Sequence, residues 1–254
     1  MAFNSFKKLL FGFAFSPSIR ANVFEVTRLA SFFNAELIFV HVGEKTTEKE
    51  TEFEALLEEC PLKPSDVSVF WKKGEPIKTL ARCCEEFEVD LLLLGALKRE
   101  NVVKYYLGSI ARKLTRKAPC SVLLMLKPSI ERIPCKHIVV NGFDSPQTQE
   151  TVEAAFSVGC ALSSEKITLV EEISESRVAV SVDDDRSLRR ATLKKEKIDR
   201  EEKIRVTDII KKIPLAKTKG LKWETQSIFG SRGYSIGHYA RIVRADLLIM
   251  NAQE

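Results

Sequence analysis

The sequence has 254 residues, of which 44% are apolar, and its formal net charge is +5. This length allows one large domain or two of ordinary size, and the apolar fraction is typical of a globular protein with a hydrophobic core. The charge is modest and comes from mixed Lys, Arg, Asp and Glu, which argues against nucleic acid as a partner. No apolar run approaches the length of a membrane span.

The N-terminus superficially resembles a signal peptide, because two lysines precede an apolar run at 9–15. That run is short, and no small-residue cleavage site follows it. We therefore expect a buried strand at 7–15 and a cytoplasmic protein.

The cysteines and histidines show no pattern of a metal or redox site. Six cysteines are scattered along the chain, and neither they nor the three histidines have the spacing of zinc ligands. Cys83 and Cys84 are neighbours on a predicted helix, where their side chains point in different directions. We expect reduced cysteines and no metal site.

In the first half, apolar runs of strand length alternate with segments of helical period. Strands are predicted at 7–15, 36–42, 67–71, 90–95 and 121–126, and helices at about 17–33, 48–60, 76–87 and 108–117. The runs at 91–94 and 122–126 lack polar alternation, which is typical of strands buried on both faces. The pattern predicts an α/β fold in which helices cover a parallel sheet.

The same pattern restarts after 127–134, where two prolines break the chain. The strand and Ser-Pro turn at 7–17 are echoed at 135–146, and the run at 88–95 is echoed at 243–251. We therefore predict two doubly wound domains, at 1–130 and 131–254. Nothing in the second copy matches 96–126, so we expect it to be incomplete at its C-terminus.

A densely charged segment at 174–212 distinguishes the second copy from the first. We expect 186–212 to form a solvated helix with one thin apolar stripe. The stripe would consist of Leu188, Ile198, Ile204, Ile209 and Ile210.

Two glycine positions in the first half suggest an anion site. Gly95 ends an apolar run, and Gly108-Ser109 stands where a helix would begin. Glycine allows close approach of the backbone to a ligand, and a helix N-terminus offers free N–H groups to an anion. Lys98 stands where a further glycine would complete a tighter loop, so it either supplies charge to a phosphate or fills the ligand's space. The alternative is that both glycines only end a strand and start a helix.

In order along the chain, these features resemble the universal stress protein family in tandem form. The matching fragments are Phe15-Ser16-Pro17, Val40-His41-Val42, Gly74-Glu75-Pro76, Gly95, Gly108-Ser109 and Ala118-Pro119-Cys120-Ser121-Val122. The family's nucleotide motif, Gly-x2-Gly-x9-Gly-Ser/Thr, reads here Gly95-x2-Lys98-x9-Gly108-Ser109, so the middle glycine is lost.

The resemblance implies an adenine nucleotide alpha hydrolase-like fold with a five-stranded parallel sheet per repeat. It also implies ATP or AMP at the carboxyl ends of the strands of the first half. The implied ligand-binding residues are Phe13, Ala14, Val42, Gly95, Lys98, Gly108, Ser109 and Ile110. For the apolar members of this set, packing in the core is the alternative role.

The resemblance also shows where this sequence departs from nucleotide-binding members. The acidic residue that would help to hold ribose or metal falls on Ala14 in the first copy and on Phe143 in the second. Asn251 replaces the glycine that ends the fourth strand of the second copy. We therefore expect any nucleotide to bind in the first half only.

No catalytic constellation is present in the sequence. We expect an adenine-nucleotide-binding sensor or regulatory module in a stress response. Its enzymatic activity would be slow ATP hydrolysis at most. The alternative is a nucleotide-free dimerisation or interaction module, for example a regulatory domain of a transporter. In the family the fifth strand commonly pairs with that of another repeat, so we expect a homodimer through 121–126. Otherwise a loop or the charged helix would cover this edge.

Overall fold

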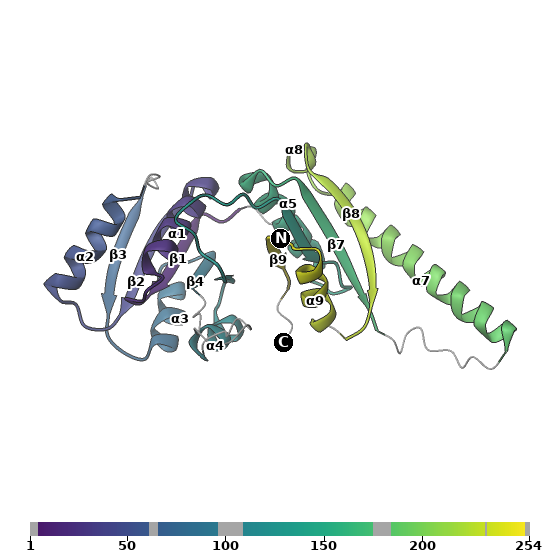
Figure 1. Cartoon of the computed structure of the whole chain (residues 1–254), viewed down its shortest axis with the longest axis horizontal. Coiled ribbons are helices and arrows are strands. Elements are labelled where there is room, and N and C mark those ends of the chain that lie inside the picture. The colour runs from purple at the N-terminus through teal and green to yellow at the C-terminus, as the bar shows by residue number, and fades with distance from the viewer. Residues whose placement is uncertain (1–4, 61–65, 96–108, 175–183, 232, 252–254) are drawn as a thin grey trace. The chain divides into compact units, whose positions relative to one another are not determined.

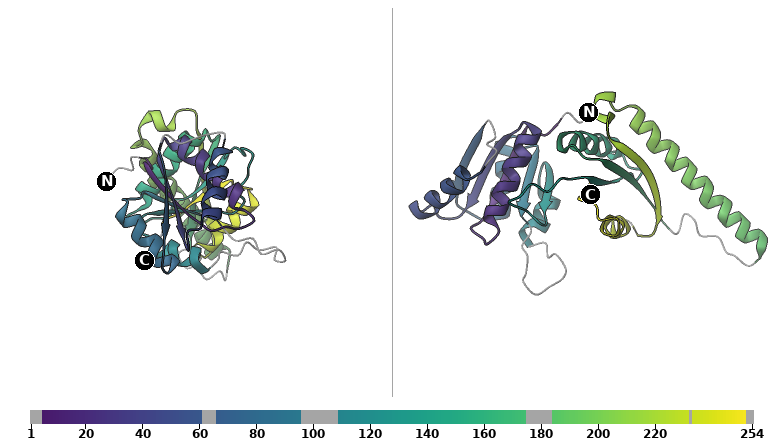
Figure 2. Two further views of the ribbon diagram at one scale, coloured as in Figure 1. Left: turned by 90° about the vertical axis from the view of Figure 1, so that its left-hand side faces the viewer. Right: turned by 45° about the horizontal axis from the view of Figure 1, so that its top comes forward.

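The computed structural model describes residues 5–60, 66–95, 109–174, 184–231 and 233–251 (Figure 1). The chain divides into two compact units, Phe6–Ile133 and a second unit formed mainly by Pro134–Glu254. In each unit, helices cover both faces of a wholly parallel sheet, as the sequence predicts. Two turned views show this layering again (Figure 2).

The first unit contains a five-stranded sheet with the order β3-β2-β1-β4-β5. Its strands are β1 (Lys8–Phe13), β2 (Glu36–Val42), β3 (Val67–Lys72), β4 (Leu91–Gly95) and β5 (Ser121–Met125). Its helices are α1 (Ile19–Phe33), α2 (Thr47–Glu58), α3 (Pro76–Glu86) and α4 (Ser109–Lys117). Each helix connects two parallel strands, which places all the carboxyl ends of the strands at one edge.

Local sequence explains where these helices begin and end. Glu75 precedes α3, and its carboxylate accepts hydrogen bonds from the backbone N–H groups of Ile77 and Lys78. Pro76 occupies the first helical position, where a missing N–H costs nothing. Helix α1 ends at Phe33, and the next residue, Asn34, adopts the left-handed conformation that stops a helix.

The two faces of the first sheet carry different side chains. Leu10, on one face, packs in a core cluster with residues of α3 and α4, including Leu80 and Leu114. Phe13, on the other face, stacks on Phe53 of α2 at 4.2 Å between ring centroids. This second face is rich in aromatic rings, which the alternation of β1 and β2 directs toward α1 and α2.

The second unit contains a four-stranded sheet with the order β8-β7-β6-β9 among the described residues. Its strands are β6 (His137–Asn141), β7 (Lys166–Ile173), β8 (Lys222–Phe229) and β9 (Leu247–Ile249). Its helices are α5 (Thr148–Leu162), α7 (Asp185–Lys211), α8 (Leu215–Thr218) and α9 (Tyr234–Ile242). No helix within the described ranges is long and apolar enough to cross a bilayer.

The repeat seen in the sequence recurs in atomic detail. In the first unit one carboxylate oxygen of Asp90 accepts hydrogen bonds from the backbone N–H groups of Lys7 and Lys8, both at 2.8 Å. In the second unit Asp246 accepts the equivalent pair from Lys136 and His137, at 2.8 and 2.9 Å. Each aspartate therefore ties the start of the fourth strand of its sheet to the start of the first strand.

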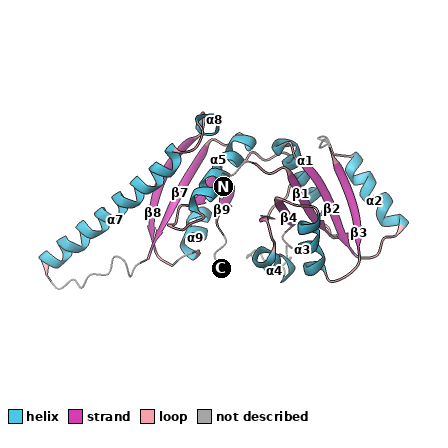
Figure 3. Cartoon of the chain, turned by 180° about the vertical axis from the view of Figure 1, so that it is seen from behind, coloured by secondary structure: helices cyan, strands magenta, loops and turns pink. Residues whose placement is uncertain are grey.

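The long charged helix α7 differs from the expected one in its buried stripe. Ile198 and Ile210 are buried as predicted, but Leu188 and Ile204 are 54% and 56% exposed. The inward positions instead follow a spacing of four, at Ile198, Glu202, Val206 and Ile210. The first turns of α7 extend past the end of β8, so apolar residues there have no sheet to cover (Figure 3).

Candidate functional site

The carboxyl ends of β1 and β4 form the point at which the strand order of the first sheet reverses. Chain connections from β1 lead to β2 on one side, and β4 lies on the other. Gly12 pairs with Leu94, so Phe13 and Gly95 stand one residue farther along these neighbouring strands. Open α/β sheets bind ligands at such a switch point.

Gly95 lies against the side chain of Asn22, which comes from the first turn of α1. A Cβ atom at Gly95 would stand 2.9 Å from both the Nδ2 and the Oδ1 atoms of Asn22, so only glycine leaves this space. Asn22 is 5% exposed, and its Nδ2 donates to Ser18 Oγ at 3.4 Å. Its Oδ1 is buried without a hydrogen-bond partner among the described residues. Such orphaned acceptors are uncommon and call for an explanation.

The residues expected at the phosphates are described only in part. Gly95 ends β4 as predicted, and Ser109 begins α4, with Ile110 as its second residue. Lys98 and Gly108 lie outside the described residues. The helix N-terminus that could receive an anion is thus found where the sequence expects it, and its contribution stays a prediction.

The residues expected near the purine do not share one environment. Phe13 is 6% exposed, and the stack with Phe53 covers a face of its ring. Ala14 is exposed, and Val42 packs with the core cluster on the face covered by α3 and α4. The side chains of Phe13 and Val42 thus lie on opposite faces of the sheet, and their role in ligand binding stays a prediction.

His41 is a buried polar group at this edge that our sequence analysis did not select as a site residue. Its Nδ1 lies 3.1 Å from the carbonyl oxygen of Phe13, and its ring contacts those of Phe13, Phe15 and Trp71. Burial lowers the pKa of His41, against the opposing effect of its hydrogen bond to Phe13. A neutral histidine therefore packs among the aromatic rings at this end of the sheet.

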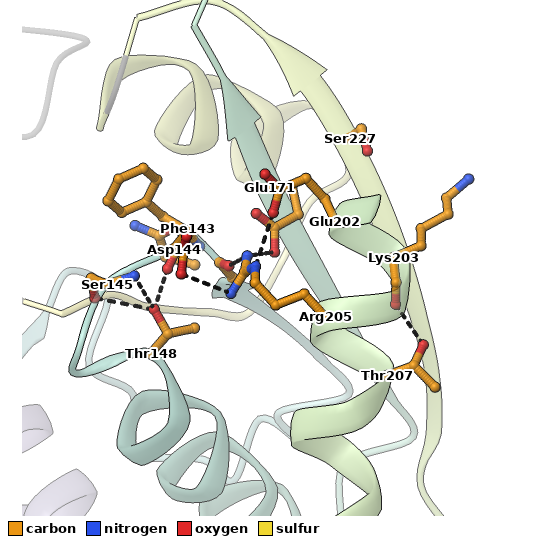
Figure 4. A network of polar contacts seen from close by, with 12 residues as sticks. Phe143, Asp144, Ser145, Thr148, Glu171, Glu202, Lys203, Arg205, Thr207 and Ser227 are labelled. Carbon is orange, nitrogen blue, oxygen red and sulfur yellow. Dashed lines mark hydrogen bonds and ion pairs between the residues drawn. The ribbon is translucent and has the colours of Figure 1, made fainter. Parts of the chain in front are cut away.

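In the second unit the corresponding edge holds an ionic network centred on Arg205 of α7 (Figure 4). The guanidinium contacts Glu171 at 2.6 Å and Glu202 at 2.9 Å, and it donates to the carbonyl oxygen of Gly142 at 2.5 Å. Asp144 lies 3.8 Å away. Residues of three elements thus meet at the carboxyl ends of β6 and β7.

Glu171 is the buried member of this network, 3% exposed. It is the sixth residue of β7, as His41 is the sixth residue of β2, so the two occupy equivalent positions. Burial raises the pKa of Glu171 to about 8, although the charge of Arg205 opposes the shift. An arginine from α7 therefore fills, in the second unit, the edge at which the first unit presents aromatic rings.

Glu172, the next residue of β7, binds the backbone at the start of α9. Glu172 is 4% exposed, and its two carboxylate oxygens accept hydrogen bonds from the backbone N–H groups of Gly233 and Ile236, at 2.9 and 2.8 Å. These N–H groups belong to the start of α9, where an anion would otherwise bind. The protein's own carboxylate already satisfies this helix terminus.

Asn251 of the second unit occupies the position that Gly95 holds in the first. Its Nδ2 donates to Ser145 Oγ at 2.6 Å, and its Oδ1 has no partner among the described residues. Here the amide comes from the strand end, whereas in the first unit it comes from α1. A side chain at this position leaves less space than the glycine of the first unit.

Residues 43–125 match the family model of the universal stress proteins. The chain contains a universal stress protein domain. The matched segment runs from the end of β2 to the end of β5, so it includes Gly95, Lys98 and Gly108-Ser109 but not Phe13 or Val42. No curated protein matches the sequence.

Solved structures support the same fold for the whole chain. A universal stress protein from Archaeoglobus fulgidus aligns over 99% of this chain and 86% of its own, with a TM-score of 0.63 and 14% identity. A protein of unknown function from Pseudomonas aeruginosa aligns over 96% and 81%, with a TM-score of 0.64 and 12% identity. These likenesses show that both units of this chain have the universal stress protein fold.

A further solved structure is a universal stress protein in complex with cAMP. It aligns over 48% of this chain and 98% of its own, with 21% identity and a TM-score of 0.39.

Proposed function

We propose that the first unit binds an adenine nucleotide and acts as a cytoplasmic sensor or regulatory module in a stress response. The observation that carries this proposal is the buried, unpartnered Oδ1 atom of Asn22 beside Gly95, at the switch point of the sheet. An amide oxygen in that position would accept a hydrogen bond from a ligand hydroxyl or amine. Ribose hydroxyls and the adenine amine are such donors.

The rest of the crevice supports an anionic ligand with a nucleoside part. The N-terminus of α4 begins at Ser109, and its free N–H groups would favour a phosphate. Ser16 and Ser18 lie shortly before Asn22 in the sequence, and their hydroxyl oxygens are 3.4 Å apart. In the second unit Asn251 stands in place of Gly95 and its Nδ2 donates to Ser145, while Arg205 fills the ends of β6 and β7, which favours a single nucleotide site.

The test is a calorimetric titration of the full chain with ATP, AMP and adenosine. Asn22→Leu removes the acceptor, so we expect about tenfold weaker binding, the value of one well-placed hydrogen bond. Asn251→Leu, the matched change at an amide whose Oδ1 also has no partner in the described part of the chain, should leave the affinity unchanged. Equal losses in both variants, or no binding to the wild-type protein at millimolar nucleotide, would contradict the proposal.

Lys98→Gly tests the departure from the family motif. If Lys98 contacts the phosphates, the variant should bind ATP more weakly and adenosine as before. If Lys98 fills the ligand's space, both ligands should bind more tightly. A change of about 1 kcal/mol, roughly fivefold in affinity, is measurable by the same titration. No change would mean that Lys98 points to solvent, contrary to both accounts.

A second candidate function is a nucleotide-free dimerisation module. The observation that favours it is the edge position of β5, which pairs with β4 and has no other strand beside it in the described part of the chain. Val122, Leu123 and Leu124 on this strand are only partly buried. An apolar edge strand of this kind is suited to pairing with another chain.

A further inference from the structure

The helices α2 and α7 occupy equivalent places in the two units, but they have opposite charges. Each follows the second strand of its sheet and leads to the third. Residues 48–59, in and just after α2, include six acidic residues and one basic residue. Residues 186–197, in the first turns of α7, include six basic residues and one acidic residue. Two helical segments of the same chain therefore have complementary charges.

Both segments present these charges on the side opposite their buried residues. Phe53, which is 1% exposed, marks the buried side of α2, and Ile198, which is 8% exposed, marks that of α7. An exposed apolar residue lies on the other side of each helix, Ala55 on α2 and Leu193 on α7. Charged neighbours three or four residues away include Glu52, Glu58 and Glu59 around Ala55, and Arg189, Arg190 and Lys197 around Leu193. Each segment thus has a small apolar centre surrounded mainly by charges of one sign.

On α2, several carboxylates lack an ion pair within the described structure. Glu50 pairs with Lys45, and Glu59 pairs with Arg20. The carboxylates of this segment that have no ion-pair partner among the described residues are Glu48, Glu52, Glu54 and Glu58. Like charges on neighbouring turns repel, so a basic partner would stabilise this side of the helix.

The basic segment of α7 shows the same pattern with the opposite sign. Lys195 lies over the ring of Phe229, and Lys197 pairs with Glu201. The cations of this segment that have no carboxylate partner in the part of the chain that the structure describes are Arg186, Arg189, Arg190 and Lys194. The unpaired cations of α7 thus match the unpaired carboxylates of α2 in number.

The basic segment is not needed to cover the second sheet. Helix α2 has 12 residues, whereas α7 has 27, and the first turns of α7 extend past the end of β8 (Figure 3). Leu188 and Leu193 in these turns are 54% and 60% exposed. The extra turns therefore present a helical surface to solvent.

We propose that this protein associates with a second copy of itself through these helices. The acidic side of α2 in one copy packs against the basic first turns of α7 in the other. Exposed ion pairs are individually weak, but several of them around an apolar contact between Ala55 and Leu193 select partner and orientation. Charge complementarity identifies the occupant, since every copy carries an acidic helix with as many unpaired charges as the basic segment has.

The first test is sedimentation velocity of the full chain at two salt concentrations. The Debye length is about 30 Å at 0.01 M salt and about 3 Å at 1 M, so the contact should form at the lower concentration and be screened at the higher. We expect the average mass to be larger at the lower concentration. Pairing through β5 uses backbone hydrogen bonds and apolar side chains, so it should account for the association that persists at high salt. A mass that does not depend on salt would overturn the proposal.

Charge reversal tests whether these two helices make the contact. The α2 reversal consists of Glu48→Lys, Glu52→Lys, Glu54→Lys and Glu58→Lys, and the α7 reversal consists of Arg186→Glu, Arg189→Glu, Arg190→Glu and Lys194→Glu. Each variant alone has like charges on both helices, so its association at low salt should be at least about tenfold weaker. An equimolar mixture should restore association, because each variant supplies the charge that the other lacks. Both reversals in one chain should restore it too, at the wild-type net charge of +5.

The matched control for the α7 reversal changes exposed cations on other parts of the chain. It consists of Lys73→Glu, Lys78→Glu, Lys219→Glu and Lys222→Glu, which alter the net charge by the same amount. This control should associate at low salt as the wild-type protein does. An equal loss in the control and the α7 reversal, or a mixture of the two reversals that stays dissociated, would contradict the proposal.

A membrane is the other anionic surface that the basic segment could contact. The wild-type protein is therefore also sedimented with vesicles that contain phosphatidylserine. Binding to these vesicles without any salt-dependent self-association would assign the basic segment to a lipid surface and overturn the proposal. The wild-type measurements need no variant, so a reversal that folds poorly would not prevent a decision.

Discussion

Glu171 and His41 occupy the same position in the two units, yet they tolerate burial by different means. His41 can remain a neutral ring among aromatic side chains, with Phe13 as its hydrogen-bond partner. A carboxylate at the same place needs a cation, and Arg205 supplies it from α7. The helix that follows this strand supplies a matching partner in each unit, because Phe53 of α2 packs on the aromatic edge and Arg205 of α7 pairs with Glu171.

Glu171 should make the stability of the second unit depend on pH. Its folded pKa, about 8, exceeds the unfolded value of 4.5, so the folded state binds more protons between these values. The free energy of unfolding should therefore fall as the pH rises from about 5 to 8, by at most about 1.4 kcal/mol per pH unit. Glu171→Gln should flatten this slope in urea unfolding followed through Trp223, in a Trp71→Phe background. Arg205, Glu202 and Asp144 face the group and are unchanged in the comparison.

The control is Glu165→Gln, which removes a largely exposed carboxylate just before the first residue of β7. It should leave the slope as it is in the parent protein. An equal slope with and without Glu171 would show that another group causes the pH dependence.

At the scale of elements, local pattern predicted most helices and strands of the first unit. The strand predicted at 36–42 matches β2, and the helix at 108–117 matches α4 within one residue. The strand at 7–15 is too long, because β1 ends at Phe13 and the Ser-Pro turn follows. Within α7, hydrophobic period could not reveal that Glu202 is buried. Glu202 pairs with Arg205 three residues along the helix, and only the fold places Arg205 against Glu171 and Gly142.

Removal of the cation should affect the second unit strongly. Arg205→Ala leaves Glu171 and Glu202 buried without their partner, so we expect a loss of about 2–3 kcal/mol in the free energy of unfolding. The guanidinium is 24% exposed, which keeps this figure below that of a fully buried pair. Lys203→Ala on the same helix breaks an exposed pair with Asp199 and should cost less than about 1 kcal/mol. Similar losses in the two variants would show that the network is only a surface feature.

For the molecule as a whole, the repeat in the sequence predicted two similar units, and Asp90 and Asp246 show how closely they correspond. The candidate site was less predictable. Gly95 could be found because the motif contains it, but Asn22 lies on a helix whose pattern gives no sign of a ligand. Its significance comes from its contact with Gly95, which is distant in sequence, and only the fold brings the two together.

The assembly of the protein depends on what covers the edge of the first sheet. β5 has one free side within the described ranges, and its middle residues are apolar and partly exposed. An unpaired apolar edge favours association, and two copies of one strand can pair about a two-fold axis. We therefore expect light scattering to give a mass near twice 28.7 kDa. Val122→Pro removes a backbone N–H from this strand and should give a monomer.

Val67→Pro places the same change at the start of β3, the opposite edge of the same sheet, and should keep the mass of the dimer. Circular dichroism of both variants separates lost association from lost folding. If the wild-type protein stays monomeric at high concentration, pairing through 121–126 is wrong. The exposed strand would then have to be covered within one chain, since an uncovered apolar edge would lead to aggregation rather than to a stable monomer.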